Sequence, residues 1–81
     1  MPHRNWQLRV ADIIEAIENV LDYCEGMTFE QFISDRRTID AVVRNFIIIG
    51  EAASHLSEDY TALHPGLPWR EMRDMRNITV H

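Results

Sequence analysis

Apolar side chains recur every three or four residues through the first quarter of the chain. The stripe is formed by Trp6, Val10, Ile13, Ile17, Val20 and Cys24. This spacing places side chains on one face of an α-helix. Ile14 and Leu21 widen the stripe, whereas most of the acidic residues fall on other faces. The pattern predicts a helix from about residue 5 to residue 25, ended by Gly26 in a left-handed conformation.

Residues 28–31, Thr-Phe-Glu-Gln, match a capping box. In this motif the Thr28 hydroxyl accepts from the backbone N–H of the third helical residue, and the Gln31 side chain accepts from the N–H of Thr28. The motif predicts a short helix with an apolar side formed by Phe29, Phe32 and Ile33. Ser34 or Asp35 is suited to cap the helix that follows.

The clearest helical pattern lies in the middle of the chain. Its main stripe consists of Ile39, Val42, Phe46, Ile49, Ala53 and Leu56. A second stripe of Val43, Ile47 and Gly50 lies beside it. Two adjacent stripes indicate a helix buried against two neighbours. The Ile-Ile-Ile run at residues 47–49 alone is compatible with a strand, but helical spacing over the eighteen residues 39–56 favours a helix.

Residues 58–67 predict a loop, with a turn at the His-Pro-Gly sequence 64–66. Pro68 is suited to the first position of another helix, in which Trp69, Met72 and Met75 would share one side. The four segments together predict an all-α fold. We expect a single domain, residues 1–81, built as an antiparallel bundle of three to four helices.

Composition restricts the compartment and the size of the core. The 81 residues contain one cysteine, Cys24, so an internal disulfide is excluded. With no signal peptide in the sequence, we expect a reducing cytoplasm. The longest apolar run, residues 46–50, is too short to span a membrane, so no membrane association is expected. A core this small gains stability from a partner surface.

Charge is distributed unevenly along the chain. The net charge of −5, without any lysine, disfavours a general nucleic-acid binder. Residues 1–69 hold eleven acidic residues and five arginines, whereas residues 70–81 hold two acidic residues and three arginines. The C-terminal stretch is the only locally basic one, and an anionic ligand is therefore expected there.

Metal and nucleotide motifs are not recognisable. The four histidines, His3, His55, His64 and His81, lack the three- or four-residue spacing of helical metal ligands. No P-loop or dinucleotide-binding motif occurs, and we expect no cofactor. Glu51 is notable because it follows Gly50 on an otherwise apolar helix. It is either a paired acid near a functional site or a residue at the rim of the core.

Arg76 and His81 together suit cleavage of an RNA phosphodiester. Histidine titrates near neutral pH and exchanges protons with the 2′-hydroxyl or the leaving 5′-oxygen. Arginine stabilises charge on the phosphoryl oxygens, and no metal is required. A separation of five residues in a straight helix rotates the side chains apart by about 140°. Convergence therefore needs a bend or a second copy of the motif. On spacing alone, an ordinary surface arginine with a terminal histidine is the better explanation.

Four ordered blocks carry a resemblance to a known family. They are residues 32–38 (Phe-Ile-Ser-Asp-Arg-Arg-Thr), 48–53 (Ile-Ile-Gly-Glu-Ala-Ala), 67–69 (Leu-Pro-Trp) and 75–81 (Met-Arg-Asn-Ile-Thr-Val-His). Through them the chain resembles, along essentially its whole length, the HepT-like branch of the HEPN ribonuclease superfamily. The last block fits the Arg-(four to six residues)-His motif of that family, with Asn directly after Arg.

The resemblance implies a homodimer or higher homo-oligomer of helical bundles, with two motifs meeting in a cleft between protomers. It implies a metal-independent endoribonuclease toxin of a type VII toxin–antitoxin system, with RNA as substrate. The implied partner is an MntA-like nucleotidyltransferase antitoxin. Arg76 and His81 would be the catalytic residues, with Asn77 and Glu51 in supporting roles.

The sequence departs from the family at its end. In the family the motif continues past His with one residue and a Tyr, which the antitoxin modifies with AMP, and a further helical segment follows. This sequence stops at His81, so it resembles either a truncated form of a longer protein or a degenerate relative. The alternative function is a non-catalytic helical module that binds a nucleotidyltransferase or a nucleotide, which the acidic charge and the shortened motif favour.

Overall fold

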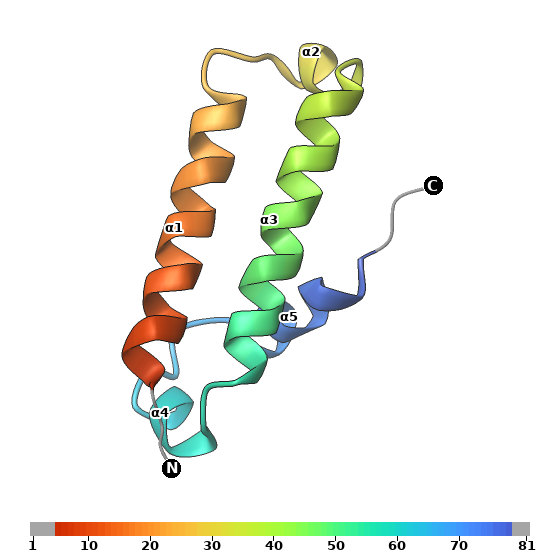
Figure 1. Cartoon of the computed structure of the whole chain (residues 1–81). Coiled ribbons are helices and arrows are strands. Elements are labelled where there is room, and N and C mark those ends of the chain that lie inside the picture. The colour runs from red at the N-terminus through yellow and green to blue at the C-terminus, as the bar shows by residue number, and fades with distance from the viewer. Residues whose placement is uncertain (1–4, 79–81) are drawn as a thin grey trace.

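The computed structural model describes residues 5–78, and in this range the secondary structure is entirely helical. The elements are α1 (Trp6–Cys24), α2 (Phe29–Ile33), α3 (Arg36–Ser54), α4 (Glu58–Ala62), α5 (Trp69–Asp74) and the 3₁₀-helix η1 (Met75–Asn77). The two long helices, α1 and α3, lie side by side and antiparallel, and α5 with η1 packs against α3 (Figure 1). The predicted all-α antiparallel bundle is confirmed, and the strand alternative for residues 47–49 is wrong because they lie within α3.

The core forms along the seam between α1 and α3. Its buried members are Ile13, Ala16, Ile49, Ala52, Ala53 and Leu56. The small alanine side chains let the two helices approach closely. Complete burial of an isoleucine side chain is worth roughly 1.5–3 kcal/mol through the hydrophobic effect, and Ile13 and Ile49 come close to it. The apolar spacing of the sequence predicted most of these positions. The outer part of the α1 stripe is not buried, however, since Ile14 and Leu21 are 51% and 66% exposed.

A pair of asparagines also lies in this seam. Asn45 is only 4% exposed. The Asn19 Nδ2 donates to the Asn45 Oδ1 at 3.1 Å, and the Asn45 Nδ2 donates to the Ala41 carbonyl oxygen at 2.9 Å. The buried amide is thereby hydrogen-bonded on both sides, which makes its burial tolerable. The bond between the helices also favours one axial register of α1 against α3.

The predicted helix ends are confirmed in detail. Gly26 has a φ of 76°. The capping box of α2 is present, with Gln31 N to Thr28 Oγ1 at 3.1 Å and Thr28 N to Gln31 Oε1 at 2.9 Å. Of the two candidate caps for α3, Asp35 is the one used, and its Oδ1 accepts from Thr38 N at 3.1 Å. The apolar side of α2 stays largely uncovered, because Phe29 is 71% and Ile33 is 53% exposed.

The loop predicted for residues 58–67 is wrong in its first half, where Glu58–Ala62 form α4. The Ser57 hydroxyl caps this helix by accepting from Tyr60 N at 3.1 Å. Glu58 and Asp59 occupy its first turn, where carboxylates interact favourably with the helix dipole. Because of these short elements, the described chain contains five α-helices rather than three or four.

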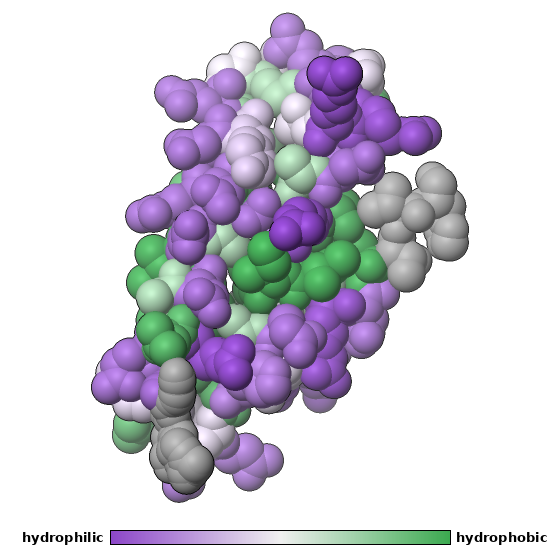
Figure 2. Space-filling view, viewed as in Figure 1, coloured by the Kyte–Doolittle hydropathy of each residue, from purple (hydrophilic) through white to green (hydrophobic). Residues whose placement is uncertain are grey.

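The segment after α4 follows the prediction more closely. A turn occupies residues 65–66, and Leu67 N donates to the His64 carbonyl oxygen at 3.3 Å. Pro68 is the N-cap of α5 rather than its first residue. Within residues 5–78, no helix combines the length and hydrophobicity needed to cross a membrane. Figure 2 shows a largely hydrophilic surface over α1 on one face of the molecule, with a hydrophobic area over the middle of α3.

Candidate functional site

The C-terminal basic segment, which consists of α5 and η1 and carries Arg70, Arg73 and Arg76, lies against α3. The two make a close backbone contact at Gly50. A Cβ atom at position 50 would overlap the Arg76 backbone nitrogen, and would lie 2.9 Å from the Met72 carbonyl oxygen and 3.0 Å from the Arg76 Cα. Only glycine permits this approach, because every other residue carries a Cβ. The sequence pattern places Gly50 in an apolar stripe and does not predict the contact. The signal was a glycine inside a long helix, which often marks a close approach.

Arg76 lies in the 3₁₀ turn that follows α5. The helix ends at Asp74, η1 spans Met75–Asn77, and Ile78 has extended backbone with φ −68° and ψ 134°. Through Ile78, the chain therefore does not continue α5 as a straight helix toward His81. Arg76 lies in a 3₁₀ turn, and the backbone is extended at Ile78. The Arg76 and Asn77 side chains are exposed. His81 lies outside the described residues.

Three guanidinium groups follow one another along this segment. Arg70, Arg73 and Arg76 are spaced three residues apart, so they occupy neighbouring positions along α5 and η1. Arg70 and Arg76 are exposed and Arg73 is half-buried. Across residues 5–78 the one ion pair lies elsewhere, between Glu51 and His55. Within residues 5–78 these arginines therefore form no close ion pair, and although the segment also carries Glu71 and Asp74, its net charge is positive and favours an anion.

Glu51 lies on α3, directly after the glycine that contacts Arg76. Its Oε2 is 3.4 Å from the His55 Nε2, one turn further along the same helix, and the two side chains are 60% and 47% exposed. The contact is an ion pair only when His55 is protonated. The structure thus pairs the Glu51 carboxylate with His55, whereas the contact with the Arg76 backbone is made by its neighbour Gly50.

A shifted pKa occurs at the opposite end of α3. The pKa of the Asp35 carboxyl lies below its usual value of 3.8, because the Thr38 backbone N–H and then the Thr38 hydroxyl donate hydrogen bonds to it. The hydroxyl reaches the Asp35 Oδ2 at 2.9 Å. Both bonds favour the charged carboxylate. Their role is to cap the helix, and the residue is unrelated to the basic segment.

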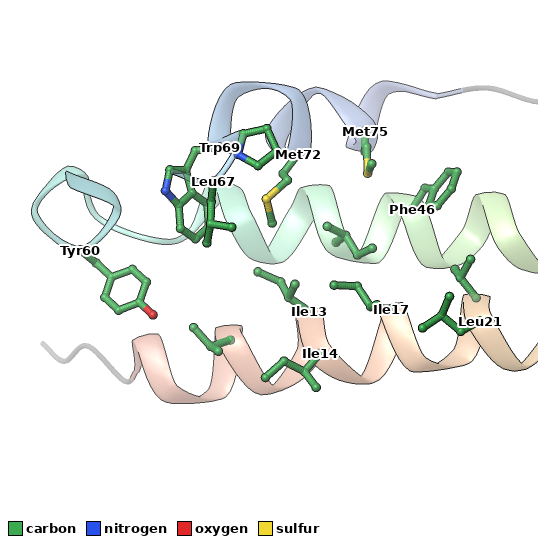
Figure 3. Close-up of a pocket in the computed structure, with 14 residues that line it drawn as sticks. Ile13, Ile14, Ile17, Leu21, Phe46, Tyr60, Leu67, Trp69, Met72 and Met75 are labelled. Atoms are coloured by element: carbon green, nitrogen blue, oxygen red, sulfur yellow. The ribbon is translucent and has the colours of Figure 1, made fainter. Parts of the chain in front are cut away.

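A large apolar groove runs between α1, α3 and α5 (Figure 3). It has a volume of about 560 Å³. Its walls include Ile14, Ile17 and Leu21 from α1, Phe46 and Ile49 from α3, and Trp69, Met72 and Met75 from the C-terminal segment. The apolar stripes of the sequence predicted a closed core and gave no indication of this groove.

Aromatic rings close one end of the groove. Tyr60 stacks on Trp6, with ring centroids 5.1 Å apart, and meets Trp69 edge-on at 6.2 Å. The Trp69 Nε1 donates to the His64 carbonyl oxygen at 2.9 Å. These contacts fix α4 and the following turn onto the ends of α1 and α5. The groove is thus a formed feature with a defined end.

Comparison with known proteins identifies relatives along the whole chain. A protein of Methanocaldococcus jannaschii, named as a proposed RNase (MJ0127), is 35% identical over 81 residues, which are 100% of this chain and 67% of the relative. A protein of Thermococcus cleftensis, named probable ribonuclease HepT, is 44% identical over 70 residues, which are 86% of this chain and 64% of the relative. The chain therefore spans about two thirds of the length of these relatives.

No solved structure matches the chain. The family model described as Ribonuclease HepT-like matches residues 13–81. This range runs from the α1–α3 seam through Gly50 to the basic segment, and it includes Arg76 and His81. The match covers far more than half of the chain, and the relatives agree with it. The chain belongs to the HepT-like ribonuclease family.

Proposed function

We propose that this chain is a metal-independent endoribonuclease in which Arg76 and His81 are the catalytic residues. The observation that carries the proposal is the position of Arg76 in a chain of the HepT-like ribonuclease family. Its backbone is packed against Gly50, while its side chain is exposed within a basic segment. A fixed backbone with a free guanidinium suits the binding of a phosphodiester from solvent.

The proposed chemistry is an internal transfer within the RNA. The 2′-oxygen attacks the adjacent phosphorus, the bond from phosphorus to the 5′-oxygen breaks, and a 2′,3′-cyclic phosphate and a 5′-hydroxyl result. His81 takes the proton of the 2′-hydroxyl or delivers a proton to the leaving 5′-oxygen. Arg76 stabilises the negative charge that develops on the phosphoryl oxygens. Asn77, exposed beside Arg76, orients the phosphate, and Glu51 supports the site from α3.

The proposed active form is a homodimer or a higher homo-oligomer. One chain provides one Arg76 and one His81, and a two-fold axis brings two such motifs to one cleft. We further propose that the enzyme is the toxin of a type VII toxin–antitoxin system, with an MntA-like nucleotidyltransferase as antitoxin. The family membership supports this assignment.

The test is cleavage of a labelled single-stranded RNA by the purified protein in the presence of EDTA. We expect cleavage by the native protein and its loss in Arg76→Ala and His81→Ala. Arg70→Ala is the matched control, because it removes another exposed guanidinium of the same segment. Cleavage unchanged by His81→Ala would refute the catalytic assignment. Absence of cleavage together with co-purification of a nucleotidyltransferase would instead favour the non-catalytic binding module.

A further inference from the structure

The N-terminal half of α3 carries three arginines that have no role in the packing of the bundle. Arg36, Arg37 and Arg44 are all exposed. Within residues 5–78 none of them forms an ion pair, because the one pair in that range joins Glu51 to His55. A guanidinium group always carries its charge near neutral pH and binds phosphate through its planar fork. These three side chains are therefore available to an anion from solvent.

Two of the three arginines stand where a positive charge is unfavourable. Arg36 and Arg37 are the first two residues of α3, and the first turn of this helix contains no acidic residue. The N-terminal end of a helix has a partial positive charge, so basic side chains lower its stability there. By contrast, α4 begins with Glu58 and Asp59. Arg36 and Arg37 therefore do not stabilise α3 through its dipole, and their charges add to the positive field at its N-terminus.

A row along α3 connects these charges to the proposed catalytic site. Arg37, Arg44 and Glu51 are spaced seven residues apart, and such a spacing rotates two side chains by only about 20° around a helix. Gly50, which directly precedes Glu51, contacts the Arg76 backbone. From Gly50, Arg44 lies about 9 Å and Arg37 about 20 Å along the helix axis. The row thus leads from the site toward the N-terminus of α3, where it is positive.

The neighbouring long helix has the opposite charge. α1 contains one arginine and four acidic residues, and the total charge of residues 1–69 therefore conceals the row on α3. Asp12 and Glu15 line a polar hollow between α1 and α3. A polyanion is repelled by carboxylates and attracted by guanidinium groups. An anionic strand that leaves the site is therefore directed away from α1 and along the row.

We infer that Arg44 and Arg37 bind successive parts of the phosphate backbone of an RNA strand that extends from the cleavage site along α3. The inference rests on the proposed function, which places the cleaved phosphodiester at Arg76. An RNA strand is favoured over an acidic polypeptide because the row begins where that strand would be cut. Phosphate contacts position a strand without reading its bases. The row therefore selects single-stranded RNA by its length, not by its sequence.

One acidic residue interrupts the row. Asp40 is exposed, three residues after Arg37 and four before Arg44, and in residues 5–78 it forms no ion pair with either. Its carboxylate repels a phosphate bound to the neighbouring arginines. Asp40→Asn should therefore strengthen RNA binding. A row of purely structural charges would show no such gain.

The test measures binding of an RNA that cannot be cut. A fluorescent single strand of about 12 nucleotides, with 2′-O-methyl groups throughout, lacks the attacking hydroxyl, and its affinity is followed by anisotropy. Arg44→Ala and Arg37→Ala should each weaken binding about threefold or more at low salt, and each should reduce the slope of log K against log salt by about 0.7. The advantage of this strand over a dinucleotide, which reaches only the cleaved bond, should shrink in both variants.

Arg9→Ala is the matched control, because it removes the same charge from another helix. α1 and α3 are antiparallel, so Arg9, near the start of α1, lies toward the C-terminal end of α3 and away from Arg37 and Arg44. Its RNA affinity and salt slope should stay close to the native values.

Two results would overturn the inference. One is an equal effect of Arg9→Ala, Arg37→Ala and Arg44→Ala, which would reduce the effect to net charge. The other is equal affinity for a polyglutamate of the same length, which would assign the row to an acidic polypeptide. Binding is measured without cleavage, so the inference can fail while the catalytic residues stand. Loss of the catalytic assignment would in turn leave the binding result unchanged.

Discussion

The backbone of Arg76 lies directly against Gly50, so closely that no side chain fits between α3 and the start of η1. The three atoms nearest to a Cβ built at position 50 all belong to the backbone of Met72 and Arg76. Backbone atoms cannot rotate away as the end of a flexible side chain can. The contact therefore fixes the distance between the middle of the bundle and the basic segment.

Gly50→Ala is expected to destabilise the protein although alanine favours helices. The helical preference of alanine over glycine contributes about 1 kcal/mol. The overlap with the Arg76 backbone costs more, because α5 and η1 must move away from α3. We expect a net loss of about 2 kcal/mol or more, seen as a fall in Tm of roughly 10 °C.

Gly66→Ala provides the control for that change. A Cβ at position 66 meets nothing within 4 Å, and the residue does not need a positive φ. Its stability should stay the same or rise by about 0.5 kcal/mol, because alanine restricts the unfolded chain. Equal Tm values for the two variants would show that the Gly50 contact does not constrain the segment.

Arg76→Ala should separate activity from stability. The Arg76 side chain is exposed, and its packing contact is made by the backbone, so Tm should change little. Under the proposed function, RNA cleavage should fall at least 100-fold, roughly the loss seen when one donor to a developing charge is removed. Arg76→Lys should recover only part of the rate, because lysine lacks the planar fork of arginine. A large drop in Tm with unchanged cleavage would contradict both expectations.

Asn19→Ala should destabilise the seam between the long helices. It removes the donor to the Asn45 Oδ1 and leaves that buried oxygen without this partner. We expect a loss of about 1–2 kcal/mol in urea denaturation. The double variant Asn19→Ala/Asn45→Leu should lose less stability than the two single variants lose in sum. It also removes the Asn45 amide that Asn19→Ala leaves without its partner. Gln7→Ala, at an exposed position on the same helix, serves as the reference and should have little effect.

The cap of α3 should make stability depend on pH in the acidic range. The pKa of Asp35 is lower in the folded chain than its usual value of 3.8, so the carboxylate stabilises the folded state above that value. The contribution is lost as the pH falls below about 4 and through the folded pKa. The difference in urea midpoint between the native protein and Asp35→Asn should therefore become smaller as the pH is lowered from 7 to 3.

Thr38→Val tests the cause of that shift. It removes the hydroxyl bond to the Asp35 Oδ2 and keeps the backbone bond to Oδ1. The Asp35 pKa, followed by NMR titration of its carboxyl carbon, should then move partway back toward 3.8. A pKa unchanged by Thr38→Val would assign the whole effect to the backbone bond.

Local signals in the sequence were sufficient for most of the helices and for several of their ends. The helical spacing of the apolar residues around Ile13 and around Ile49, the capping box at Thr28 and the glycine at position 26 are each recognisable from a few neighbouring residues. α4 was missed because Ser57 was not recognised as a cap and because Tyr60 is stabilised by Trp6 and Trp69, which are distant in sequence.

The site depended on contacts that no local pattern encodes. Arg76 was proposed from its charge and its motif, but the proximity of its backbone to Gly50 depends on the path of the chain between them. The groove was missed for a related reason. The apolar stripe of α1 was expected to be covered, and hydrophobic spacing does not reveal whether a neighbour is present to cover Ile14 and Leu21.

The contact between Gly50 and Arg76 has a consequence for the divergence of this fold. The atoms of Arg76 that hold the bundle together are not the atoms proposed to act on RNA. Substitution of Arg76 by another residue would remove the proposed activity in a single step, while the scaffold would still fold. Replacing the glycine would have a different result, because it would push α5 and η1 away from α3 and so disturb the scaffold as well as the chemistry. We therefore expect inactive members of this fold to retain the glycine at position 50 and to vary the arginine at position 76.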